Sequence, residues 1–196
     1  MKPVVTDYRP FAAFLTLFDK EVLRFRKIAL HAILAPILTS ILYLLVFGEV
    51  LKGKMSVLGG VDYVAFLIPG LVMMALLQNA FANSASSILQ SKIMGSIVFI
   101  ELPPFSGWQL AAAFISSVAR GLIVGAGVFA ATCLWSVPPL ENVFWVLGFA
   151  ILGAALMASL GVICGLWAEK YDQMGAFQSF VIMPLTFLSG VFYSVE

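Results

Sequence analysis

Five long hydrophobic segments constrain this chain of 196 residues more than any other feature of its sequence. A helix needs about 20 predominantly apolar residues to cross the hydrocarbon core of a bilayer, and each segment comes close to that length. Composition agrees, because only 11% of the residues are charged, whereas soluble domains carry about 25%. The sequence therefore predicts an all-α polytopic membrane protein. The five predicted spans are Ile28–Gly48, Tyr63–Ala82, a third that begins between Gln109 and Gly121 and ends at Trp135, Phe144–Ala168, and Phe177–Val195.

The first 27 residues have the pattern of neither a signal peptide nor a membrane span. Apolar side chains recur there at helical spacing, with charged residues on the opposite side. Pro10 suits the first turn of such a helix, where its missing N–H is harmless. We expect residues 1–27 to form a cytoplasmic, amphipathic helix in the membrane interface, and residues 28–196 to form the transmembrane domain. The apolar stripe consists of Phe11, Phe14, Leu15, Phe18, Val22 and Phe25.

The distribution of lysine and arginine predicts a cytoplasmic N-terminus, because cytoplasmic loops carry an excess of basic residues. This orientation places on the cytoplasmic side the six basic residues of the first 27, together with Lys92 and Lys170. The other side receives only Lys52 and Lys54. Two links then face the cytoplasm, residues 83–107 and residues 169–176. The longer link is expected to contain a helix from about Ser84 to Leu102, which the following prolines end.

No catalytic, cofactor-binding or metal-binding set stands out. His31 is the single histidine, and we expect it to pack against a backbone carbonyl. Together with Cys133 and Cys164, which we expect to be structural thiols, it cannot supply the four ligands of a zinc site. The segment 48–54 fits a P-loop until its last position, where Met55 replaces the hydroxyl that should bind magnesium. A net charge of +1 also argues against nucleic-acid binding. We therefore expect a chain that is not an enzyme.

Arg120 is the one charge that could lie inside the bilayer, where mid-depth placement costs about 2.5–3.5 kcal/mol. One interpretation is an arginine that caps a helix or extends toward the inner headgroups. The other is an arginine that faces a polar cavity on the translocation path and meets an anionic headgroup. Three amides toward the inner end of the second span, Gln78, Asn79 and Asn83, could likewise bond neighbouring helices or line a polar route.

Small residues repeat at a spacing of four in three places. A spacing of four puts them one turn apart on the same face of a helix, which allows two helix backbones to approach closely. We therefore expect close helix packing at Gly121 and Gly125, at Ala154 and Ala158, and at Gly161 and Gly165.

Several strings of residues resemble those of the ABC-2-type transporter permeases. The most specific is Pro184–Ser194, and Ile68–Met74, Ser91–Val98 and Ala119–Leu122 are also similar to family patterns. These strings run from end to end of the chain. The closest similarity is to bacterial inner-membrane permeases that include polysaccharide, nodulation-factor and drug exporters.

The resemblance implies the membrane subunit of an ATP-binding cassette exporter, located in the bacterial inner membrane. Such permeases pair as dimers, and we expect a homodimer that binds two cytoplasmic P-loop ATPase subunits, which hold the ATP and magnesium. The resemblance places the main coupling helix at Gln90–Leu102 and a second contact at Glu169–Gly175. The candidate coupling residues are Lys92, Gly95, Glu101, Pro103, Pro104, Glu169 and Asp172.

Two departures from the family pattern accompany the resemblance. Relatives often carry an acidic residue where this chain has Phe99, and Glu101 lies two positions further on. Family members usually have six spans, with a re-entrant hairpin before the last, whereas this chain stops at Glu196 where the hairpin should begin. We therefore expect a C-terminal truncation that removes the sixth span. The alternative function is an ATP-independent channel or secondary transporter, against which the absence of acidic residues inside the predicted spans argues.

Overall fold

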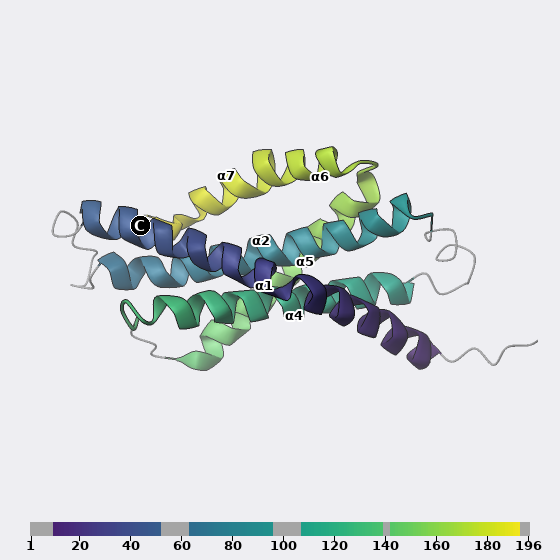
Figure 1. Cartoon of the computed structure of the whole chain (residues 1–196), viewed down its shortest axis with the longest axis horizontal. Coiled ribbons are helices and arrows are strands. Elements are labelled where there is room, and N and C mark those ends of the chain that lie inside the picture. The colour runs from purple at the N-terminus through teal and green to yellow at the C-terminus, as the bar shows by residue number, and fades with distance from the viewer. Residues whose placement is uncertain (1–9, 52–62, 96–106, 139–141, 193–196) are drawn as a thin grey trace, which may run out of the picture.

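The computed structural model describes residues 10–51, 63–95, 107–138 and 142–192, and these residues form helices joined by turns. The predicted all-α class is confirmed. Figure 1 shows the elements in order. The four long helices are α1 (Pro10–Leu51), α2 (Tyr63–Ile93), α4 (Gly107–Thr132) and α5 (Val143–Trp167). A run of short helices follows, with π-helical geometry in η1 and η2: α6 (Tyr171–Phe177), η1 (Gln178–Ile182), α7 (Met183–Thr186) and η2 (Phe187–Val191).

Four helices in the described part of the chain are long and apolar enough to cross a membrane. Their apolar stretches are Ala29–Gly48, Tyr63–Ile93, Leu110–Thr132 and Val143–Trp167. They match the first four predicted spans and differ from them mainly at the ends, because α2 continues beyond Ala82 and α4 ends before Trp135. The fifth predicted span falls on the run from α6 to η2 and stays a prediction.

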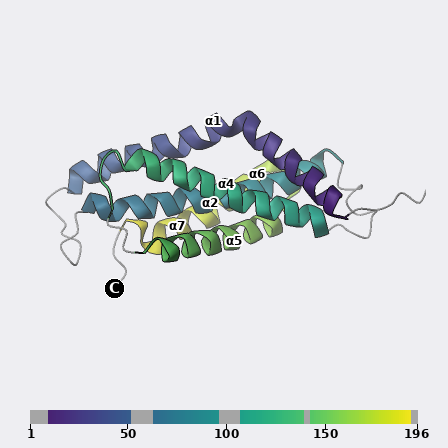
Figure 2. The same ribbon diagram turned by 90° about the horizontal axis from the view of Figure 1, so that it is seen from below.

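The helix α1 begins at Pro10, as predicted, but it does not stop at residue 27. It continues as one helix into the first span, because the sequence around residue 27 contains neither glycine nor proline to end it. Figure 2 shows this helix bent along its length. The interfacial position of its N-terminal part stays a prediction. One expectation about its surface is wrong, because His31 is exposed rather than packed. Glu21, which sequence reasoning did not single out, is only 7% exposed.

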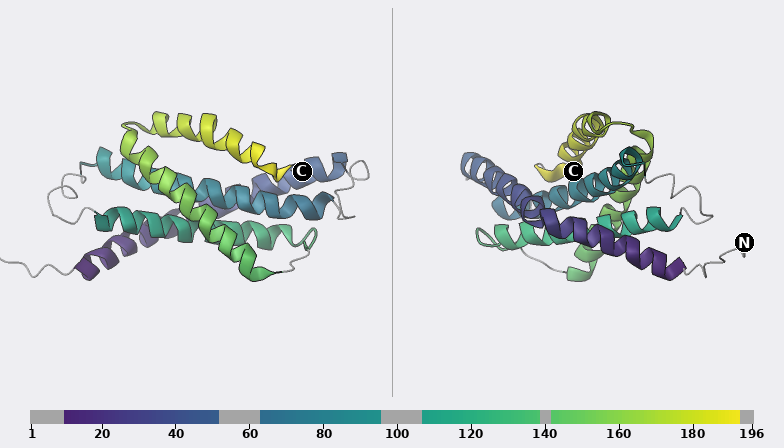
Figure 3. Two further views of the ribbon diagram at one scale, coloured as in Figure 1. Left: turned by 180° about the vertical axis from the view of Figure 1, so that it is seen from behind. Right: turned by 45° about the vertical axis from the view of Figure 1, so that its right-hand side comes forward.

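The helix α2 lies in the middle of the bundle. Figure 1 shows α1 crossing α2 and α4 on one face, and Figure 3 shows α5 crossing the same two helices diagonally on the opposite face. The run from α6 to η2 lies along α2. Half of the apolar stretch of α2 is consequently buried, against 11% for that of α1.

Close packing against α2 uses the small residues that the sequence singled out. A Cβ atom built on Gly161 would lie 2.5 Å from the carbonyl oxygen of Phe81, and one on Gly165 would lie 2.8 Å from that of Ala85. A Cβ on Gly121 of α4 would lie 3.0 Å from the Leu76 carbonyl. Ala154 and Ala158 are completely buried. All three predicted small-residue pairs therefore lie at helix contacts.

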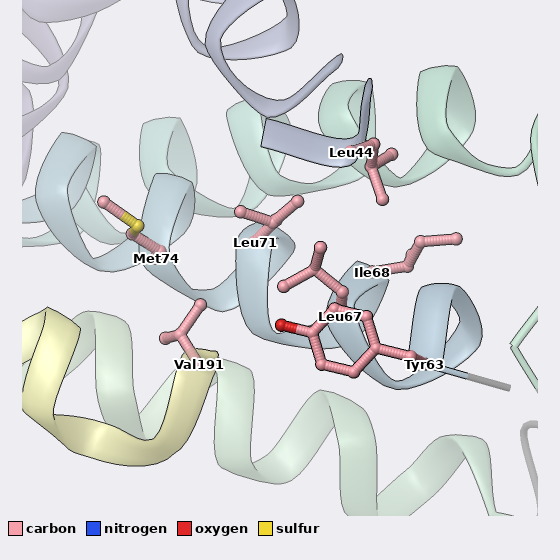
Figure 4. Packing of buried hydrophobic residues seen from close by; sticks show 7 residues of the cluster. All are labelled: Leu44, Tyr63, Leu67, Ile68, Leu71, Met74 and Val191. Atoms are coloured by element: carbon pink, nitrogen blue, oxygen red, sulfur yellow. The ribbon is translucent and has the colours of Figure 1, made fainter. Parts of the chain in front are cut away.

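The last described residues pack against the first turns of α2. Figure 4 shows Val191 of η2 beside the apolar side chains of α2, with Leu44 of α1 on the other side of the cluster. The Tyr63 hydroxyl donates a hydrogen bond to the Phe192 carbonyl at 3.1 Å. These contacts bring together the ends of α1 and η2 with the beginning of α2.

Candidate functional site

The two links predicted to face the cytoplasm meet at one end of the bundle. At this end α2 and α5 finish, while α4 and α6 begin (Figure 1). The Lys92 ammonium donates hydrogen bonds to the Leu166 carbonyl at 2.6 Å and to the Ala168 carbonyl at 2.8 Å. The last carbonyls of a helix have no partner within it and carry partial negative charge, so a cation stabilises them. Lys92 therefore caps α5 and joins the end of α2 to the end of α5, directly before the second link.

Gly95 ends α2 rather than continuing a coupling helix. Its φ angle is +68°, and its N–H donates to the Lys92 carbonyl at 3.0 Å. Glycine is favoured at this left-handed position after a helix. A Cβ on Gly95 would meet no atom within 4 Å, so the backbone angle, not the space, requires glycine here. The predicted helix from Ser84 to Leu102 is wrong in its start and continuity, because α2 passes through Ser84 unbroken and stops at Ile93.

The other coupling candidates fall into two groups. Glu169 lies in the turn between α5 and α6, Asp172 lies in the first turn of α6, and both are exposed. The Glu169 N–H donates to the Gln173 side chain at 2.7 Å, and Asp172 places an acid in the first turn of α6, where the helix dipole favours it. Glu101, Pro103 and Pro104 lie outside the described residues.

Arg120 lies within the apolar stretch of α4 and binds a polar group of α2. Its guanidinium donates to the Asn83 side-chain oxygen at 2.7 Å. Arg24 of α1 donates to the same oxygen at 2.8 Å. The Arg120 guanidinium carbon also lies 5.3 Å from the centre of the Phe25 ring, close enough for a cation–π interaction. The Asn83 oxygen thus links Arg24 of α1 and Arg120 of α4 to α2.

Further side chains complete this network, which we call the polar cluster. The Asn83 amide donates to the Ser117 hydroxyl at 2.9 Å, and the Ser87 hydroxyl donates to Glu21 at 2.7 Å. A Glu21 oxygen also lies 2.9 Å from the Arg24 guanidinium. The polar cluster consists of Glu21 and Arg24 from α1, Asn83, Ser87 and Gln90 from α2, and Ser117 and Arg120 from α4.

The polar cluster carries more positive than negative charge. Glu21 pairs with Arg24, and Arg120 is held by the neutral Asn83 amide and the Phe25 ring. The Arg120 Nε atom is buried and has no hydrogen-bond partner among the described residues. The cluster therefore keeps one net positive charge between α1, α2 and α4.

Sequence reasoning found part of this site. It singled out Arg120 and left two interpretations open for Asn83, a bond to a neighbouring helix or a polar route. The Asn83 contacts with α4 confirm the bond. Gln78 also bonds outside its own helix, to Thr186 at 3.3 Å, whereas Asn79 bonds the Ala75 carbonyl of its own helix. Sequence reasoning missed the roles of Glu21 and Arg24, which it did not single out within the amphipathic helix. Their spacing of three could have signalled an intrahelical ion pair, but not its burial against α2.

Comparison with known proteins identifies relatives over nearly the whole chain. The family model described as ABC-2 type transporter matches residues 12–196. Inner membrane transport permease YadH of Escherichia coli (strain K12) is 32% identical over 186 residues, which cover 94% of this chain and 73% of that protein. Nodulation protein J of Neorhizobium galegae is 25% identical over 197 residues, which cover 93% of this chain and 71% of that protein. No solved structure gives a significant match.

Proposed function

The chain belongs to the ABC-2 type transporter family, and on that premise we propose that it is the membrane-spanning permease of an ATP-binding cassette exporter. A separate cytoplasmic P-loop ATPase binds ATP with magnesium and hydrolyses it, and the permease moves substrate out across the bacterial inner membrane. The observation that carries the proposal is the family match over residues 12–196. The relative from Escherichia coli is named as an inner membrane transport permease.

The proposed topology has a cytoplasmic N-terminus, and the run from α6 to η2 serves as a fifth span. Its support is the excess of basic residues before and between the spans at one end of the bundle. Two hydrogen bonds join this part of the chain to α2, one between Gln78 and Thr186 and one between Tyr63 and Phe192, the residue after η2. These contacts support a fifth span, because a run that packs along a membrane-spanning helix shares the depth of that helix. Two copies of the chain pair as a homodimer.

The proposed ATPase contact is the end of the bundle where Lys92 joins α2 to the α5–α6 turn. This junction supports the proposal because a force that the ATPase applies to either link is transmitted to both α2 and α5. Glu169 and Asp172 offer exposed acids to the partner, and Glu101, Pro103 and Pro104 belong to the proposed contact by sequence. Arg120 is the proposed translocation-path residue, since its cationic charge lies in an apolar helix without a balancing acid of its own.

Purification from native membranes through an N-terminal tag tests this function. We expect a P-loop ATPase at about equal stoichiometry, and efflux in sealed vesicles that requires ATP. The double variant Glu169→Lys/Asp172→Lys should lower both ATPase recovery and efflux. The control Val137→Lys adds a charge at an exposed position between α4 and α5, at the opposite end of the bundle, and should leave both unchanged. Efflux driven by an ion gradient without nucleotide would instead establish the ATP-independent transporter.

A further inference from the structure

A groove of about 690 Å³ opens between the N-terminal part of α1 and the last turn of α2. We call it the α1–α2 groove. It borders the polar cluster, since Arg24 and Gln90 belong to both. Its lining residues are Asp19, Lys20, Leu23, Arg24 and Lys27 from α1, with Gln90, Ser91 and Met94 from the end of α2.

The α1–α2 groove is basic. Three cations and the single acid Asp19 line it. Among the described residues, Glu21 and Arg24 form the one ion pair. Lys20 and Lys27 therefore face the groove without a carboxylate partner in the described part of the chain. Both lysines are exposed. The groove therefore attracts an anion, and the positive charge of Arg120 behind Arg24 adds to the attraction.

The position of the α1–α2 groove selects a lipid over a soluble anion. Lys27 lies two residues before Ala29, where the apolar stretch of α1 begins, and Met94 follows directly on the apolar stretch of α2. This is the level at which apolar helices leave the hydrocarbon core and meet headgroups. One side of the groove is apolar, because Leu23, which is 55% exposed, lines it.

The groove face of α1 continues into the membrane as a row of leucines. Leu30, Leu34 and Leu38 follow Lys27 at intervals of three or four residues, which keeps them on one side of the helix. They are 69%, 46% and 64% exposed. A basic groove beside an exposed apolar row matches the two parts of a phospholipid, its anionic headgroup and its acyl chains.

We propose that the α1–α2 groove binds the headgroup of an anionic phospholipid. The lipid phosphate lies between Lys20 and Lys27, and the acyl chains lie along the leucine row of α1. This site differs from the anionic headgroup at Arg120 that one of the two sequence interpretations suggested, because Asn83 and Phe25 already contact that guanidinium. An acidic segment of a partner protein would match the lysines but would leave the leucine row uncovered. The inference depends on membrane insertion and not on the ATPase.

Lipid titration of the full chain in neutral detergent, read by native mass spectrometry, tests the proposal. We expect phosphatidylglycerol to bind more tightly than phosphatidylcholine. Lys20→Gln and Lys27→Gln should each weaken phosphatidylglycerol binding about five-fold, the usual contribution of one lysine near an anionic membrane surface. The matched control is Arg26→Gln, which removes the same charge from an exposed neighbour that does not line the groove. It should change the affinity less than two-fold.

Three results would overturn the proposal. The first is equal affinity for the two lipids. The second is an equal loss in Arg26→Gln and Lys27→Gln, which would show general attraction between charges and no site. The third is binding of soluble glycerol 3-phosphate as tight as that of phosphatidylglycerol, which would show a phosphate site that does not use the leucine row. Loss of ATPase recovery with unchanged lipid binding would concern the proposed function alone.

Discussion

Replacing Gly161 by alanine adds one methyl group where α5 and α2 approach most closely among the described glycines. The new Cβ would lie 2.5 Å from the Phe81 carbonyl oxygen and 2.8 Å from the Ser84 Cβ. Ordinary van der Waals contact begins at 3.4 Å, so the first distance must grow by about 0.9 Å. A backbone carbonyl in a helix cannot rotate away as a flexible side chain does. The two helices must therefore separate locally.

The free energy of this change has two parts. Overpacking a close contact costs about 1–3 kcal/mol. Alanine in a helix is about 1 kcal/mol more favourable than glycine, which offsets part of that cost. The net loss in the free energy of unfolding is therefore up to about 2 kcal/mol.

Gly148→Ala is the matched control for Gly161→Ala. Both glycines lie in α5, but a Cβ on Gly148 would meet no atom within 4 Å. Gly148→Ala should gain the stability that alanine gives a helix, without the steric clash. The free energies of unfolding of the two variants should therefore differ by the overpacking cost of about 1–3 kcal/mol. Unfolding in mixed micelles with a rising fraction of dodecyl sulfate measures this difference. Equal unfolding midpoints for the two variants would refute the close contact between α5 and α2.

Three further predictions concern the polar end of the bundle. Asn83→Leu should destabilise the protein by about 3 kcal/mol or more, because two guanidinium groups each lose a charge-assisted hydrogen bond. The control Asn79→Leu removes one bond to the Ala75 carbonyl of its own helix and should cost less in the same micelle assay. A larger cost at Asn79 would contradict the polar cluster. Lys92→Met should speed hydrogen exchange in the last turn of α5, with protection restored in Lys92→Arg; unchanged exchange would show that the cap does not stabilise that turn. Arg120→Ala should slow efflux at normal expression with partial recovery in Arg120→Lys, and unchanged rates in both would remove Arg120 from the translocation path.

Hydrophobic segment length predicted the helices of the membrane domain, because an apolar run of this length has few other stable states. The first four predicted spans correspond to four long helices. The ends of the helices were less predictable. The predicted second span ends at Ala82, before the polar residues from Asn83 to Gln90. These residues face α1, α4 and α5 rather than water.

The candidate site was only partly predictable for a related reason. Arg120 drew attention because it is a lone charge in an apolar sequence, and that signal is local. The burial of Glu21 depends on Ser87, which lies 66 residues away in the chain. The shared role of the Asn83 oxygen depends on two arginines from different helices. No periodicity within one segment records such contacts, because they arise only from the crossing of α1, α2 and α4.

The central place of α2 has a consequence for the order in which the protein is made. Synthesis proceeds from the N-terminus, so α2 enters the membrane before α4 and α5. When α4 arrives with Arg120, whose transfer alone costs about 2.5–3.5 kcal/mol, the Asn83 oxygen is already at hand to accept its guanidinium. When α5 arrives, the surface of α2 that fits Gly161 and Gly165 is already present. Both α4 and α5 thus meet a surface of α2 that is already in the bilayer. Arg120 is exposed to lipid only until it reaches the Asn83 oxygen.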